Sequence, residues 1–395
     1  MSETPLHGVR VLDFTWMLAG PYATRIFADF GAEIIKVQSK KTARGAESNL
    51  TGYFNTWNRN KRSMTLDLSH PEAREIVLKV AGKCDVVIEN FSPRVMPNLG
   101  LDYEKLKEVK PDLVMLSMSA MGQRGPWKDY VAYAPTLHAL SGLTQLTSLK
   151  EDAPIGLGYA FADIVAGLYA AFAVLAALEY RDRTGQGQYI DLSEYEALCT
   201  FMGPFLLDAS VNRKEILPPV DRLEYIAAAP YGCYQCSGED RWCVIAVSGE
   251  AEWQRLCRVL GHPDWTKEKR FATTAERREN RKELDDFLSK WTIQHRAEEV
   301  VNLLQEAGIA SGVVQNAEDL AGDSQLKARN FFVQLDHPVL GKTVADRSPI
   351  KFEEDCTADW KAAPQLGEDN RYLFLELLGF TEEELSRYVE RGVIA

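Results

Sequence analysis

The stretch from Val9 to Val37 reads VRVLDFTWMLAGPYATRIFADFGAEIIKV and decides the fold of this chain. Its first six residues form an apolar run typical of a buried strand, and Pro21 suits the first turn of a helix. Gly31 ends that helix, and Ile34 to Val37 form the next strand. A strand, a helix and a second strand in this order predict a right-handed crossover between two parallel strands.

The same pattern repeats outward from this unit. Candidate strands follow at 63–68, 85–89, 113–117 and 188–192. Two of them, DVVIE and LVMLS, are continuous apolar runs, as expected of central strands in a parallel sheet. The apolar run from Ile164 to Leu178 is too short to cross a bilayer, so it predicts a buried helix. We therefore expect a doubly wound, Rossmann-like α/β domain over residues 1–200.

The pattern changes after residue 200. Residues 201–225 contain Pro218-Pro219 and predict a linker, and residues 226–325 predict a hairpin followed by amphipathic helices. That combination is typical of a smaller α+β domain. Residues 326–395 are expected to return to the large domain and to end in two helices, 366–378 and 382–389.

Composition narrows the class of protein. The 395 residues carry a net charge of -12, which argues against nucleic-acid binding. No export signal and no membrane span is recognised, so a cytoplasmic protein without a membrane partner is expected. The seven cysteines are odd in number and scattered, as in a protein with reduced thiols. No G-x-G-x-x-G or P-loop motif occurs, which disfavours an NAD-dependent oxidoreductase and any nucleotide redox cofactor.

One cysteine pair raises the question of a metal. Cys233 and Cys236 form a C-x-x-C within a stretch that alternates like a hairpin. Residues three apart on a strand point to opposite faces, so the pair is poorly placed to share a zinc ion. We predict no metal site.

Three features could carry chemistry. Asp163 lies directly before the long apolar helix, where it is either an N-cap or a carboxylate held ionised by the helix and able to act as a nucleophile. The basic turn Asn58-Arg59-Asn60-Lys61-Arg62-Ser63 is either a solvated loop or a contact for phosphates. His138 interrupts an apolar helical pattern and is either a packed side chain or a base.

Ordered motifs along the chain are more specific than any of these features alone. They are LDFTWMLAGPYATRIFADFGAEIIKV, NRNKRSMTLDL, DVVIENFSP, SMSAMGQRGP and AFADIVAGLYAAFAVLAALEYRDRTGQGQYIDLS. Together they make the chain resemble the class III CoA-transferases, of the formyl-CoA and carnitine CoA-transferase type. The resemblance implies a Rossmann-like large domain completed by the C-terminal segment, a smaller domain, and two chains interlocked as linked rings.

The resemblance also implies the chemistry. An aspartate matching Asp163 attacks the thioester of an acyl-CoA, and CoA passes to a free carboxylic acid through an aspartyl anhydride and an aspartyl-CoA thioester. CoA enters and leaves as part of the substrates, and no metal takes part. The implied oxyanion and substrate pocket is the turn Trp16, Met17, Leu18, Ala19 and Gly20. The implied CoA-binding residues are Asn60, Lys61, Arg62, Asn90, Phe91, Ser92, Asn98, Leu99, Val131, Ala132 and Tyr133.

Departures from the family pattern bear on the substrate. Formyl-CoA transferases place Gln where this chain has Leu18, so we expect a bulkier or more apolar acid, aromatic or of succinate type. An α-methylacyl-CoA racemase remains an alternative, although it needs a His-Asp pair where this chain has Tyr133 and Ala134. A homodimer is expected, and a heteromer with a related chain stays open.

Overall fold

The structure is a computed structural model that describes residues 4–148, 154–213, 227–353 and 359–394. Contacts between residues divide the chain into two units. The large unit takes in residues 4–147, 154–213 and the described residues from 328 to 394, and the small unit takes in residues 227–327. Pro218-Pro219 of the predicted linker lies outside the described residues.

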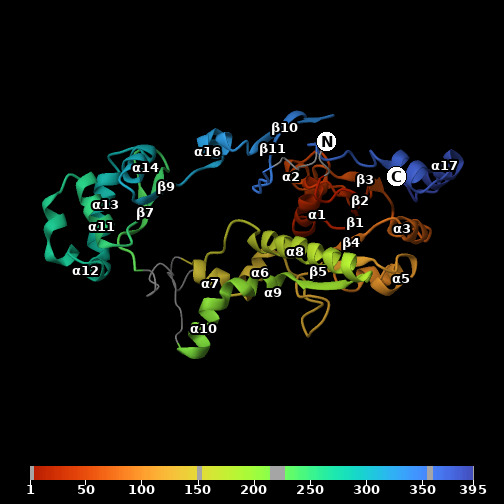
Figure 1. Ribbon diagram of the computed structural model, residues 1–395, viewed down its shortest axis with the longest axis horizontal. Helices are drawn as coiled ribbons and strands as arrows, with labels where there is room; N and C mark the ends of the chain where they lie inside the picture. The colour runs from red at the N-terminus through yellow and green to blue at the C-terminus, as the bar shows by residue number, and fades with distance from the viewer. Residues whose placement is uncertain (1–3, 149–153, 214–226, 354–358, 395) are drawn as a thin grey trace. The chain divides into compact units, whose positions relative to one another are not determined.

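A six-stranded parallel sheet forms the centre of the large unit (Figure 1). Every neighbouring pair of strands runs parallel, which confirms the predicted α/β fold. The chain winds from the centre to one edge and then from the centre to the other. The strand order is β3 (Arg62–Thr65), β2 (Glu33–Gln38), β1 (Arg10–Asp13), β4 (Val86–Glu89), β5 (Val114–Ser119) and β6 (Tyr189–Ser193).

Helices cover both faces of this sheet. On one face α1 (Ala19–Asp29) and α8 (Phe161–Thr184) share a core with side chains such as Val11, Ile34 and Val86. The other face packs residues such as Leu12 and Ile35 against α3 (Ala73–Ala81), α5 (Tyr103–Val109), the π-helix η6 (Tyr372–Leu377) and α17 (Glu382–Glu390). Because both faces are buried, successive residues of the central strands are mainly apolar, as in Val86-Val87-Ile88 of β4.

Shorter elements complete the large unit. An antiparallel hairpin is formed by β10 (Phe332–His337) and β11 (Gly341–Asp346). The short helices are α2 (Gly52–Asn58), α4 (Val95–Asn98), α6 (Ala134–Leu140), α7 (Leu143–Thr147), α9 (Glu194–Cys199), α10 (Gly203–Val211) and α16 (Ser324–Ala328), which spans the boundary between the units.

The predicted helix over residues 366–378 is wrong in extent. Helical structure begins only at Asn370 and continues as η6, since the preceding residues are bound to the edge strand β3. The backbone N–H of Asp369 donates to the carbonyl oxygen of Ser63 at 3.2 Å, and the Asn370 side chain accepts from the Thr65 N–H at 2.9 Å. These bonds cover the open edge of the sheet with the C-terminal segment.

The small unit is an antiparallel sheet covered by helices. Its strands are β7 (Tyr231–Gln235), β8 (Trp242–Ala246) and β9 (Ala310–Val313), and its helices are α11 (Glu250–Val259), α12 (Thr274–Glu279), α13 (Arg281–Thr292), α14 (Ala297–Glu306) and α15 (Ala317–Gly322). Cys233 is exposed whereas Cys236 is buried, so their side chains do face different environments. Among the described residues no group of three or more metal-ligating side chains comes together.

The long helix α8 is only partly buried. Among the described residues it is the one helix long and apolar enough to cross a membrane. One side of it, including Ala166, Ala170 and Val174, lies in the core. The opposite side exposes Leu168 and Phe172, the latter at 72%. The prediction of a buried helix therefore holds for one face of α8 and is wrong for the other.

Gly187, just before β6, supports a prediction about stability. A Cβ atom there would stand 2.1 Å from the carbonyl oxygen of Leu113, and backbone cannot move aside as a flexible side chain can. Gly187→Ala should therefore lower the free energy of unfolding by at least about 2 kcal/mol, measured by urea titration. Gly52→Ala, whose added methyl group meets nothing within 4 Å, is the control and should leave stability unchanged or slightly raised. Equal stability of the two variants would contradict the prediction.

Candidate active site

The strand order identifies one edge of the sheet as the place for a ligand. Sheets of this type bind ligands outside the carboxyl ends of the strands, at the point where the winding reverses. Here the reversal lies between β1 and β4. α1 follows β1 and α8 follows β5 in the crossover to β6, so both helices begin at this edge. Their first turns are therefore brought together where a ligand is expected.

Asp163 lies in the first turn of α8. The N-cap position is taken by Ala160, so the helix begins before Asp163. The sequence had predicted a helix that begins after it. The cap interpretation of Asp163 is therefore wrong. A carboxylate in the first turn still meets the positive end of the helix dipole, which favours its ionised form.

The environment of the Asp163 carboxyl combines burial with backbone donors. Burial raises its pKa to about 6, while hydrogen bonds from its own backbone N–H and from that of Ala19 act in the opposite direction. Ala19 is the first residue of α1. The carboxylate therefore meets the N-termini of two helices and is ionised above about pH 6.

Gly167, one turn further along α8, allows this close approach. A Cβ atom at Gly167 would stand 2.8 Å from the carbonyl oxygen of Ala19 and 2.9 Å from the ring of Tyr22. Any larger residue would push α1 and α8 apart. The absence of a side chain at Gly167 thus helps to bring the Ala19 N–H to Asp163.

The predicted pocket turn has two kinds of residue. The side chains of Trp16 and Met17 are 47% and 36% exposed, so a substrate can reach them. Leu18, Ala19 and Gly20 are buried, so they can contribute only their backbone groups. Met17 has φ of 61°, a left-handed conformation that is costly for a residue with a side chain.

Further side chains near Asp163 were not predicted from the sequence. Burial and then the charge of Asp163 raise the pKa of Tyr53 to about 12 and that of Glu194 to about 8. Burial also raises the pKa of Tyr159, with a smaller contribution from Asp163. Glu194 thus keeps its proton at neutral pH. No motif marks these three residues, because they come from α2, α9 and a loop that meet only in the fold.

His138 lies behind the site and not in it. Its ring is buried, and Nε2 accepts a hydrogen bond from the backbone N–H of Ala162 at 3.1 Å. Burial lowers the pKa of the imidazole. His138 therefore binds a free N–H of the first turn of α8 as a neutral side chain, which agrees with the packed interpretation.

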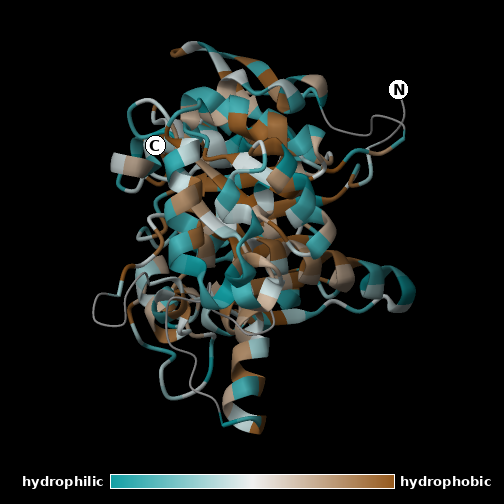
Figure 2. Cartoon of the chain, turned by 90° about the vertical axis from the view of Figure 1, so that its left-hand side faces the viewer, coloured by the Kyte–Doolittle hydropathy of each residue, from teal (hydrophilic) through white to brown (hydrophobic). Residues whose placement is uncertain are grey.

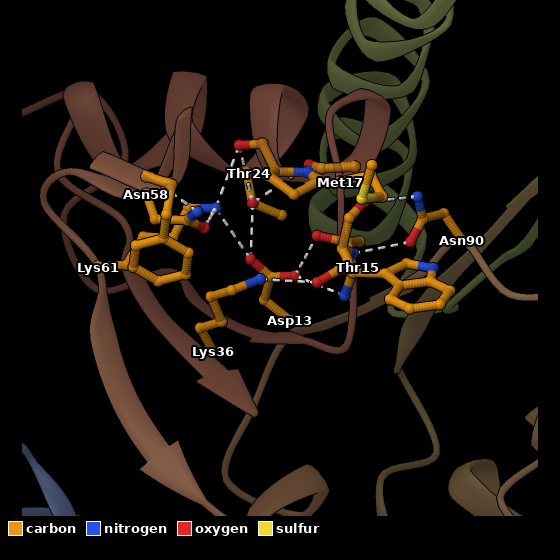
Figure 3. Close-up of polar contacts among 12 residues, drawn as sticks. Asp13, Thr15, Met17, Thr24, Lys36, Asn58, Lys61 and Asn90 are labelled. Atoms are coloured by element: carbon orange, nitrogen blue, oxygen red, sulfur yellow. Dashed lines mark hydrogen bonds and ion pairs between the residues drawn. The ribbon is translucent and has the colours of Figure 1, made fainter. Parts of the chain in front are cut away.

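The structure contradicts the predicted phosphate contact of Lys61. Its ammonium group is buried and donates to Asp13 at 3.1 Å, to the carbonyl oxygen of Pro21 at 3.1 Å and to Asn58 at 2.9 Å (Figure 3). An ammonium group has three donors, and all are used. Lys61 has none left for a ligand.

The neighbours of Lys61 are also engaged elsewhere. The Asn60 side chain bonds Asp29 and the backbone of Lys361. Arg62 bonds Asp369 and Glu33, the first residue of β2, so it points to the amino ends of the strands. The polar groups of Asn60 and Lys61 are therefore used to fix the fold. Arg62 keeps part of its guanidinium group exposed, and its contact with CoA stays a prediction.

The other predicted CoA residues lie at or near the carboxyl edge with varied exposure. Phe91 packs its ring edge against Trp16, with ring centroids 6.5 Å apart. The Asn90 side chain holds the backbone of Trp16. The remaining residues are exposed or half-buried, namely Ser92, Asn98, Leu99, Val131, Ala132 and Tyr133.

A cavity of about 300 Å³ lies beside these residues. It joins Trp16 and Phe91 to side chains that follow β2 and β3, which the sequence did not single out. These are Ser39, Lys41, Thr42, Leu68 and Ser69. Lys41 is the exposed cation of the group, and its ammonium group lies 2.7 Å from Asp67 and 3.1 Å from Ser69. Apolar walls with a few polar groups are typical of a site for part of a larger ligand.

Comparison with known proteins identifies the family of this chain. The model of CoA-transferase family III matches residues 6–370. Succinyl-CoA–D-citramalate CoA-transferase from Chloroflexus aurantiacus is 31% identical, over 99% of this chain and 98% of its own length. Formyl-CoA:oxalate CoA-transferase from Bradyrhizobium sp. is 27% identical, over 98% and 97%.

A solved structure is similar over nearly the whole chain. A CAIB/BAIF family protein from Brucella suis is 30% identical and superposes with a TM-score of 0.86, covering 95% of this chain and 100% of its own. The match thus includes both units and the C-terminal segment. The chain belongs to CoA-transferase family III and is an enzyme of the CoA-transferase class.

Proposed function

We propose that this enzyme moves CoA from an acyl-CoA to a free carboxylic acid with Asp163 as the covalent nucleophile. The observation that carries the proposal is the position of the Asp163 carboxylate, which meets the first turns of α1 and α8 and accepts the N–H of Ala19. Partial burial makes this carboxylate more basic than a solvated one, and basicity favours nucleophilic attack.

The reaction proceeds by exchange of one acyl bond at a time. An Asp163 oxygen attacks the thioester carbonyl carbon, the carbon–sulfur bond breaks, and a mixed anhydride and CoA thiolate form. The thiolate attacks the aspartyl carbonyl, which releases the donor acid and leaves an aspartyl-CoA thioester. The acceptor carboxylate attacks that thioester, which releases CoA thiolate and forms a second anhydride. The thiolate then attacks the acceptor carbonyl of this anhydride, which gives the new acyl-CoA and frees Asp163. Protein N–H groups at the helix termini stabilise the oxyanions that form at each step.

The cavity beside Trp16 and Phe91 supports a position for CoA. It opens at the same strand edge as Asp163 and combines aromatic walls with hydroxyl groups and Lys41. We propose that it takes the nucleotide end of CoA, with Lys41 in the role first expected for Lys61. The pantetheine arm would then run past Trp16 toward Asp163.

The side chains around Asp163 support the expected class of acid. Trp16 and Met17 offer exposed apolar surface, and Tyr53 adds a phenol beside the carboxylate. An aromatic or succinate-type acceptor fits such walls better than a small polar acid does. The name of the Chloroflexus relative makes succinyl-CoA the first donor to test.

The racemase alternative has less support. It needs a His-Asp pair at the positions of Tyr133 and Ala134, and neither of these residues is a histidine or an aspartate. The nearest histidine in the sequence, His138, is buried and accepts a backbone N–H through Nε2.

A homodimer is proposed on the basis of the uncovered apolar faces. Leu168 and Phe172 are exposed on one side of α8, and α10, which has no buried residue, exposes Leu206, Leu207 and Val211. Figure 2 shows apolar bands on α10, the helix at the lower edge of that view. Contiguous apolar patches of this kind mark protein interfaces.

We also propose a cytoplasmic location, which the free cysteines of the described residues support.

Covalent trapping tests the nucleophile. Acyl-CoA and hydroxylamine should modify one aspartate, Asp163, and Asp163→Asn should abolish both the modification and CoA exchange with a panel of acids. Asp182→Asn, on the exposed far end of the same helix, should retain both. Peptide mapping by mass spectrometry reads the modification. Modification at another residue, or exchange by Asp163→Asn at the rate of the unmodified enzyme, would refute the assignment.

The raised pKa of Asp163 also predicts a stability effect. The folded-state pKa of about 6 exceeds the ordinary value of 3.8, so the stabilisation by the protonated form is complete below about pH 4 and lost as pH rises through 6. Asp163→Asn cannot ionise and should unfold at a higher temperature than the unmodified enzyme at pH 7.5, with the difference vanishing toward pH 4. Calorimetry across this range measures it. A difference independent of pH would show that Asp163 is not perturbed.

The oligomeric proposal has its own test. Light scattering after gel filtration should give twice the mass of one chain for the purified protein. Phe172→Glu places a charge on the exposed face of α8 and should lower that mass, whereas Glu179→Gln, a surface change on the same helix, should not. A monomer that becomes active only with a second, related chain would favour the heteromer.

A further inference from the structure

A network of buried charges lies under the turn that precedes α1. Its centre is Asp13, the last residue of β1, which is fully buried (Figure 3). One carboxylate oxygen of Asp13 accepts the backbone N–H and the hydroxyl of Thr15. The other accepts the Thr24 hydroxyl at 2.7 Å and the Lys61 ammonium group at 3.1 Å. Asp13 therefore ties the turn to the middle of α1.

Two lysines complete this network. Lys36, on the neighbouring strand β2, donates to the carbonyl oxygen of Thr15 at 2.7 Å. Lys61 donates to the carbonyl oxygen of Pro21, in the first turn of α1, at 3.1 Å. Both lysines are buried. Asp13 and Lys36 thus bind the N–H and the C=O group of Thr15 at the start of the turn. Asp13 and Lys61 also bind α1, at Thr24 and at Pro21.

The rest of the turn is bound in the same manner. The Asn90 side chain takes both the N–H and the C=O of Trp16, each at 3.0 Å, and Glu47 accepts the N–H of Met17 at 2.9 Å. Met17 keeps a left-handed backbone, which is costly for a residue with a side chain and persists only where the surroundings determine it. A Cβ atom at Gly20 would stand 2.3 Å from the Thr15 side chain, so the turn is also packed tightly.

This arrangement gives the fold little stability of its own. Burying charges costs several kcal/mol per ion, and apolar residues of similar volume are often as stable. The turn that the network holds leads directly into Ala19, whose N–H meets Asp163. A change in the turn would therefore be felt first at that hydrogen bond.

We propose that Asp13, opposed by Lys36 and Lys61, is a positioning residue that holds the turn Thr15–Leu18 so that the Ala19 N–H faces the reacting carboxylate of Asp163. The proposal rests on the proposed function. It assigns Lys61 a role inside the protein, in place of a contact with CoA. Asp13 and Lys61 line no part of the cavity assigned to CoA, whereas Lys36 lies in its wall, and all three act through the backbone of the turn and of α1.

Asp13→Asn tests this inference, with Asp29→Asn as the matched control. Asp29 is also a buried carboxylate on the α1 side of the sheet, and it pairs with Arg59 at 2.7 Å, but it lies at the far end of α1. Both variants should lose stability in thermal unfolding. Asp13→Asn should lower kcat about 100-fold, as expected when a reacting group is displaced, and change KM for acyl-CoA little, whereas Asp29→Asn should keep kcat.

A second readout does not depend on turnover. Without the Ala19 N–H the pKa of Asp163 should rise above 6, since a hydrogen bond to the charged form is lost. The stability difference between chains that keep Asp163 and chains that carry Asp163→Asn changes with pH, and its midpoint reports this pKa. That midpoint should move to higher pH when Asp13→Asn is added to both chains. It should not move when Asp29→Asn is added to both chains. Glu194, Tyr53 and Tyr159 also face Asp163 and are unchanged throughout.

The outcomes separate this inference from the proposed function. If acyl-CoA modifies Asp163 and Asp13→Asn retains kcat and the midpoint, the positioning role is wrong. Equal losses of kcat in Asp13→Asn and Asp29→Asn would also overturn it. If the unmodified enzyme forms no adduct at Asp163, the proposed function fails, but the midpoint still tests the positioning. Should Asp13→Asn not fold, Thr24→Val removes one bond between Asp13 and α1 and is read by the same measurements, with a smaller loss expected.

Discussion

The approach of the Asp163 carboxyl to the first turn of α1, where the Ala19 N–H acts to lower its pKa, is the contact on which the candidate site depends. It joins the first turns of two helices that lie far apart in the sequence and side by side on one face of the sheet. Gly167 leaves room for the approach, and the parallel sheet places both helix starts at its carboxyl edge. A carboxylate held in this way is ionised near neutral pH and yet remains only partly solvated.

Buried charge around the turn is the complement of that contact. Asp13, Lys36 and Lys61 contribute little surface to any ligand, because their polar atoms are used by the backbone and by one another. Burying these charges costs desolvation free energy. The turn that they bind is held in one conformation. The same logic explains Met17, whose left-handed backbone is maintained by Glu47. Buried charge and a left-handed backbone thus meet at this one turn.

The apolar layers were the part most open to prediction. Strands such as 85–89 and 113–117 were located to within two residues, since a strand buried on both faces must be apolar throughout. The C-terminal helix at 366–378 was overestimated, because hydrogen bonds to Ser63 and Thr65 compete with helix formation and no local pattern reveals them. Lys61 was misjudged for a similar reason, as a basic turn has the same composition whether its lysine faces solvent or Asp13.

The sequence by itself determined the α/β architecture, the family resemblance and the choice of Asp163, because apolar periodicity and ordered motifs are properties of the chain. Only the tertiary structure decided what surrounds Asp163. Tyr53, Glu194 and the Ala19 N–H come from separate elements. The charge of Asp163 raises the pKa of Tyr53 and Glu194, the Ala19 N–H acts on the pKa of Asp163, and both effects depend on distance and burial. Neither quantity exists until the elements pack. That is also why Lys61 became an internal support and Lys41 the cation beside the cavity.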